Sequence, residues 1–128
     1  MSQLLKEQTI HLDMLRPFSG AIRGIVAGDT GNRFHILIES DGSEVSLESG
    51  HRVVLVVHSG RGVVTQDSSV DGNGITFTAG TNQVDVELFA STFSSGANLC
   101  LLQIYSTGTS TDDTLISAMP FSFEAVRV

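Results

Sequence analysis

Asp29, Thr30 and Gly31 form the Asp-Thr-Gly tripeptide that carries the catalytic aspartate in aspartic proteases. In a chain of 128 residues that chemistry requires a homodimer, because two carboxylates must share one site while only one of them holds a proton. The flanking residues depart from the protease pattern: Ala27 and Gly28 precede Asp29, and the later apolar run "NLCLLQIYSTG" reaches its glycine late. The sequence therefore favours a structural turn made by Gly28, Asp29, Thr30 and Gly31. A homodimeric protease that uses Asp29 is the enzyme hypothesis.

The remaining carboxylates, histidines and cysteine form no second catalytic or metal-binding pattern. "DGNG" at 71–74 begins like a calcium loop, but Ile75 and Asn82 stand where an EF-hand needs its fifth and twelfth ligand positions. Cys100 lies in an apolar run, where a thiol behaves as a small buried hydrophobe. No metal-like spacing relates the four histidines, which are His11, His35, His51 and His58. We therefore expect no catalytic residue, no cofactor and no metal, and a protein that is not an enzyme.

The charge of the chain argues against two classes of partner. Fourteen Asp and Glu against seven Lys and Arg give a formal net charge of -7, which opposes binding to nucleic acids and to anionic membranes. The N-terminal "MSQLLKEQTI" lacks the apolar core of a signal peptide, and no run approaches the ~18 apolar residues of a membrane helix. We expect neither nucleic acid nor membrane as a partner.

Short runs that alternate apolar and polar residues predict strands along most of the chain. "RFHILIES" and "NQVDVELFA" show the alternation of half-buried strands, whereas "HRVVLVVH" and "NLCLLQIYS" are continuous apolar runs typical of central strands. Turn signals separate these runs, and no helical periodicity is sustained. The pattern predicts an all-β fold, an antiparallel β-sandwich of about seven to nine strands.

The chain divides into an N-terminal arm or extra strand, residues 1–19, and a β-sandwich domain, residues 20–128. "TIHLDMLRPF" is an amphipathic strand outside the sandwich, and such a strand needs a partner edge. One interpretation is that copies of the chain meet there, through Ile10, Leu12, Met14, Leu15 and Phe18. The other is that the segment completes the chain's own sheet, and the sequence leaves both open.

Five stretches in this order carry a resemblance to a known family: "GDTGNRFHILI", "DGSEVSLESGHRVVLVV", "GNGITFT", "ELFASTFSSGANLCLLQIY" and "SAMPFSFEAV". From about Ile22 to Val128 the chain resembles the N-terminal domain family of phage upper baseplate proteins. The resemblance implies an immunoglobulin-like sandwich that helps to assemble the host-attachment organelle of a virion, often within a trimer.

On this resemblance we expect a non-catalytic structural protein of a phage or prophage tail baseplate, made in the bacterial cytoplasm and built into the virion. Its expected partners are further copies of itself, with a trimer favoured, and other tail or baseplate proteins. The alternative is a carbohydrate-binding or adhesion module of sandwich fold. Such modules expose aromatic rings to sugars, and this chain has no Trp and a single Tyr, Tyr105.

Overall fold

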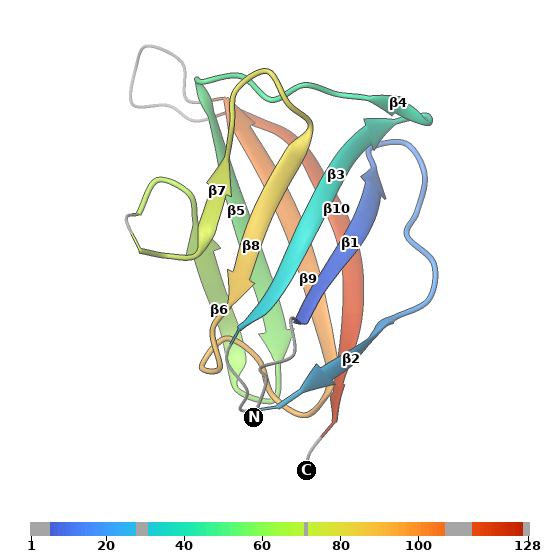
Figure 1. The fold of residues 1–128 in the computed structure, drawn as a ribbon, viewed down its shortest axis with the longest axis vertical. Helices are drawn as coiled ribbons and strands as arrows, with labels where there is room; N and C mark the ends of the chain where they lie inside the picture. The colour runs from blue at the N-terminus through green and yellow to red at the C-terminus, as the bar shows by residue number, and fades with distance from the viewer. Residues whose placement is uncertain (1–5, 28–30, 71, 107–113, 127–128) are drawn as a thin grey trace.

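The structure, a computed structural model, describes residues 6–27, 31–70, 72–106 and 114–126, and these form strands and connecting turns without a helix (Figure 1). The ten strands are β1 (Lys6–Asp13), β2 (Ile22–Val26), β3 (Asn32–Ser40), β4 (Ser43–Glu44), β5 (His51–Ser59), β6 (Gly62–Asp67), β7 (Ile75–Phe77), β8 (Gln83–Leu88), β9 (Gly96–Ser106) and β10 (Thr114–Val126). This confirms the predicted all-β class. The strand number exceeds the expected seven to nine, because the two-residue β4 carries too little sequence to show a pattern.

The strands form two sheets that pack face to face (Figure 1). Sheet A has the order β1-β3-β8-β7, with β4 also pairing with β3, and sheet B has the order β2-β10-β9-β5-β6. The two continuous apolar runs are β5 and β9, which lie in the interior of sheet B, as predicted, and pair with each other. Their inward side chains therefore meet sheet A, and the sandwich buries its core between the layers.

The expectation of purely antiparallel pairing is wrong at two edges. β1 runs parallel to β3 in sheet A, and β2 runs parallel to β10 in sheet B. Parallel neighbours need a long connection rather than a hairpin. Residues 14–21 carry the chain from β1 in one sheet to β2 in the other, so the N-terminal segment adds an edge strand to each layer (Figure 1).

A chain of phenylalanine rings holds the two sheets together. Phe34 of sheet A packs edge to face against Phe123 of sheet B, with ring centroids 5.7 Å apart, and against Phe121 at 6.1 Å. Phe93 continues the chain beyond Phe123 at 5.5 Å, and Phe18 continues it beyond Phe121 at 6.2 Å. Edge-to-face contacts at these distances are favourable for aromatic rings. The rings thus join both sheets to the β1–β2 connection.

Asp13 fixes the end of β1 to the turn that follows β3. Its carboxylate accepts hydrogen bonds from the backbone amides of Leu15 at 2.8 Å, Asp41 at 2.9 Å and Gly42 at 2.8 Å. Burial opposes the charged form, but these amides and the charge of Arg16 together lower the pKa of Asp13. The ionised carboxylate therefore anchors the N-terminal strand to sheet A.

Candidate functional site

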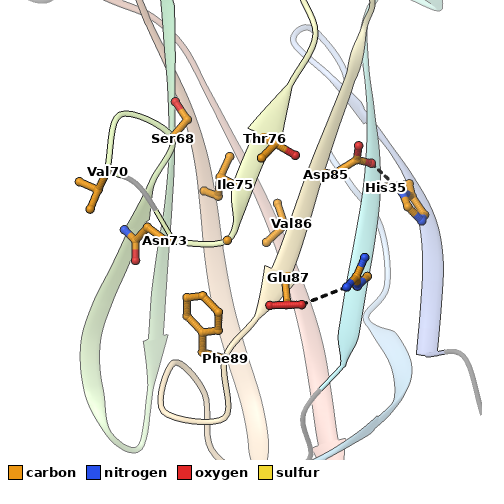
Figure 2. A pocket seen from close by; sticks show the side chains of 13 residues that line it. His35, Ser68, Val70, Asn73, Ile75, Thr76, Asp85, Val86, Glu87 and Phe89 are labelled. Carbon is orange, nitrogen blue, oxygen red and sulfur yellow. Dashed lines mark hydrogen bonds and ion pairs between the residues drawn. The ribbon is translucent and has the colours of Figure 1, made fainter. Parts of the chain in front are cut away.

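A cavity of about 480 Å³ opens beside the edge strand β7, between β8 and the segment that joins β6 to β7 (Figure 2). Its apolar wall consists of Val70, Ile75, Val86 and Phe89. Its charged wall comes from the outward side of β3 and β8, where strand alternation points Arg33, His35, Asp85 and Glu87 away from the core. The cavity thus combines an apolar wall with a wall of two basic side chains, Arg33 and His35, and two acidic side chains, Asp85 and Glu87.

His35 is the centre of the charged wall. Its Nδ1 lies 2.6 Å from Oδ1 of Asp85 on β8, and its Nε2 lies 3.1 Å from Oε1 of Glu7 on β1. The Gln83 amide nitrogen also donates to Oδ1 of Asp85 at 2.7 Å. Figure 2 shows the contact between His35 and Asp85. Next to it, Arg33 donates to Glu87 at 3.2 Å. His35 therefore links β1, β3 and β8 across the surface of sheet A.

The two partners shift each other's ionisation. The hydrogen bond to Asp85 is the largest effect on His35, and together with Glu7 it raises the pKa of the imidazole above its ordinary value despite partial burial. For Asp85, burial is the largest effect and opposes ionisation, but Gln83, His35 and Arg33 outweigh it and lower the pKa of the carboxyl. His35 is thus stabilised as a cation that donates from both ring nitrogens.

The ionisable groups of this wall are engaged with one another. A general base needs an unprotonated nitrogen within reach of a substrate proton, whereas both nitrogens of His35 face carboxylates. Burial raises the pKa of the Cys100 thiol to about 12, so the thiolate that acts as a nucleophile is disfavoured. Within the described ranges, no group of three or more His, Cys, Asp or Glu side chains is placed to hold a metal ion. The charged wall is built as a set of ion pairs.

The ionisation of His35 predicts how stability depends on pH. Because the pKa of His35 is raised in the folded state, its charge stabilises the fold fully below pH 6.5, which is the ordinary pKa. This stabilisation is lost as the pH rises through the folded pKa. Asp85 has the opposite pH dependence. Its ionised carboxylate stabilises the fold above pH 3.8, the ordinary pKa, and this stabilisation is lost as the pH falls through the lowered folded pKa. We expect the urea midpoint to fall as the pH rises above neutrality, modestly, because the pair is partly exposed.

The matched variants are His35→Gln and Asp85→Asn. The midpoint of His35→Gln should change less than that of the native chain across the neutral to alkaline range. In an NMR titration of the native chain, the imidazole of His35 should titrate above 6.5, the ordinary value, and Asp85→Asn should move that titration downward. A His35 pKa at or below the ordinary value in the native chain contradicts the ion-pair account.

The residues expected to form the first turn lie mostly outside the described part of the chain. Gly28, Asp29 and Thr30 are not described, so the turn and the protease hypothesis for Asp29 both stay predictions. Gly31 is described, and its φ of +84° is the left-handed conformation that glycine adopts most easily. Asp71, at the start of the rejected calcium loop, is also outside the described residues.

The five residues expected at contacts between copies fall into two groups. Ile10 and Leu12 are 4% and 1% exposed and belong to the core of this chain, because β1 pairs with β3 along its whole length. Met14 and Phe18 are partly buried against the same core, and Leu15 is 69% exposed. The segment thus adds a strand to the chain's own sheet. Contacts between copies at these residues stay a prediction, for which Leu15 is the most accessible side chain.

The cluster of His35 and its partners was not predicted from the sequence. The available signal was the charge on the outward positions of two strands, Arg33 and His35 on one and Asp85 and Glu87 on the other. Only the register, which pairs Arg33 with Glu87 and His35 with Asp85, shows that opposite charges meet.

In the described part of the chain, no helix is long and apolar enough to cross a membrane.

Comparisons with known proteins show a similarity of fold. No protein-family model and no curated protein matches the sequence. Among solved structures, the fold is similar to the N-terminal domain of phage TP901-1 ORF48, with a TM-score of 0.73 and 12% sequence identity over 94% of this chain and 98% of that chain. The two chains therefore share a fold along almost their entire lengths.

Proposed function

We propose that this chain is a non-catalytic structural protein of a phage or prophage tail, built into the baseplate, where it forms interfaces with other subunits. The observation that carries the proposal is the structural similarity to the N-terminal domain of a phage protein over 94% of this chain and 98% of that chain. The sequence resemblance to phage upper baseplate domains points to the same organelle. Copies of the chain and other tail proteins are the proposed partners, and the virion is the proposed location.

The chemistry of the surface supports an assembly role over catalysis. The charged side chains around the cavity are paired with one another, as Arg33 with Glu87 and His35 with Asp85. A ligand would have to compete with these ion pairs for every charged group on that wall. The pairs instead stabilise the sheet, which suits a domain that serves as a rigid building unit.

A carbohydrate-binding module has less support. Sugar rings stack on exposed aromatic faces, and Tyr105 is the chain's one tyrosine. The guanidinium carbon of Arg52 lies over its ring, 4.6 Å from the centroid, so that face already has a partner. Phe89 is only half-exposed at the cavity.

The experiment is mass spectrometry of phage particles purified from the source bacterium after induction. We expect the chain in the particles in a fixed ratio to the other tail proteins, and particles from a strain lacking the gene should have incomplete tails. An abundant cytoplasmic protein serves as the control for carry-over. Expression in the induced cells without incorporation into particles would overturn the proposal.

A further inference from the structure

The outer face of sheet B combines apolar and polar side chains. Strand alternation points one set of side chains from β6, β5, β9 and β10 into the core and the other set outward. The register places six apolar residues on the outward side, Val56, Val63, Leu99, Leu101, Leu115 and Pro120, among polar residues that include Arg52, His58, Thr65, Asp67, Gln103 and Ser122. Val63 and Leu99 are each 61% exposed, and Leu115 is 48% exposed. Val56, Leu101 and Pro120 are cross-strand neighbours, so they form an apolar centre surrounded by polar residues, which is the arrangement of a protein interface.

The charges of the two sheets differ. The strands of sheet B carry four charged side chains besides histidine, and they form two neutral pairs, Arg52 with Asp67 at 2.5 Å and Arg23 with Glu124 at 2.8 Å. The strands of sheet A carry six acidic and two basic side chains, a sum of -4. The strands of sheet A therefore carry -4 of the chain's charge of -7, and the strands of sheet B carry no net charge.

This distribution fits a second copy of the chain as the occupant. Two copies that approach through sheet A bring like charges together, whereas two copies that approach through sheet B meet without net charge. A basic partner would instead be attracted to sheet A. A two-fold contact brings the same patch of both copies together, so a patch without net charge avoids repulsion between them.

The size of the face is sufficient for such a contact. With strands ~4.8 Å apart and outward rows ~6.8 Å apart, four strands and four rows cover about 500 Å² on each copy. Two such faces bury about 1,000 Å², which is near the lower limit for a specific interface. The expected dimer is therefore weak, with a dissociation constant on the order of 100 µM, and is favoured where copies are concentrated.

We propose that the outer face of sheet B is the surface through which two copies of this chain associate, sheet against sheet. The proposal rests on the assembly role proposed above and names its contact surface. Sheets that pack face to face lie about 10 Å apart. At that spacing the side chains of Leu99, Leu101 and Val63 interdigitate with those of the second copy.

The test is sedimentation equilibrium of the full chain from about 10 µM to about 1 mM, a range that spans the expected dissociation constant. The mean mass should rise from that of the monomer, 13.6 kDa, toward twice that value. Leu99→Glu should raise the dissociation constant at least about tenfold, because it buries a charge in the contact and repels its copy. Val70→Glu is the matched control: Val70 is 54% exposed between β6 and β7, outside the strands of sheet B, and its substitution should leave the association unchanged. Leu15→Glu tests the alternative contact through the N-terminal segment.

Amide NMR spectra across the same dilution series locate the contact independently of any variant. Shifts confined to β5, β6, β9 and β10 are expected. A native chain that stays monomeric at the highest concentration overturns the proposal, while the particle experiment still decides the assembly role. Association that Leu15→Glu abolishes and Leu99→Glu does not would also overturn it, and would assign the contact to the N-terminal segment within the same assembly role.

Discussion

Replacing Phe123 by alanine is expected to lower the free energy of unfolding by about 4 kcal/mol. Its side chain is fully buried, and its ring lies 5.7 Å from that of Phe34 and 5.5 Å from that of Phe93. The substitution removes the transfer energy of a whole ring and leaves a cavity between the sheets. It also interrupts the ring chain at the position that joins sheet A to the segment before β9. Urea unfolding followed by circular dichroism measures the loss.

Phe77→Ala is the control for this prediction. Phe77 packs against the core but is only partly buried. It takes no part in the ring-to-ring contacts that link Phe123 to the other phenylalanines. Because less area and no ring pair is lost, its cost should be about half that of Phe123→Ala or less. Equal costs at the two positions would show that the ring chain contributes nothing special to the packing of the sheets.

The sequence predicted most strands because alternation depends only on neighbouring residues. In β8, Val84, Val86 and Leu88 point inward, as their period of two indicates, and the polar residues between them point outward. The two central strands were also predicted, because long apolar runs favour the interior of a sheet over its edge. Both patterns are local, so they are readable without the partner strand.

Pairing between distant strands could not be predicted in the same way. The contact of His35 with Asp85 depends on a register between residues far apart in the sequence, and the parallel position of β1 depends on where the chain crosses between sheets. Asn98 has no alternation signal of its own, yet it is fully buried and its amide donates to the carbonyls of Ser94 and Gly96. Buried polar residues of this kind are recognised by their partners, which only the fold supplies.

Gly74→Ala is expected to lower the free energy of unfolding by about 3 kcal/mol. Gly74 has a φ of +85°, a conformation that costs alanine about 1 to 2 kcal/mol. A Cβ there would also lie 2.6 Å from the amide nitrogen of Gln66 and 2.7 Å from the carbonyl oxygen of Glu87. Gln66 is 1% exposed and donates to the carbonyls of Asn73 at 2.9 Å and Glu87 at 2.8 Å. Displacing it breaks buried hydrogen bonds between the edges of the two sheets, at an additional cost of about 1 to 3 kcal/mol.

Gly72→Ala separates the two causes. Gly72 has a similar φ of +75°, but a Cβ there would meet no atom within 4 Å, so only the conformational cost should remain. The difference between the two urea-derived losses then measures the close approach to Gln66 and Glu87. Gln66 belongs to β6 of sheet B and Glu87 to β8 of sheet A. That difference therefore measures how much the packing and hydrogen bonding between these two strands stabilise the sandwich. Equal losses for the two variants would mean that the backbone conformation alone explains glycine at position 74, and that the buried amide of Gln66 adapts without cost.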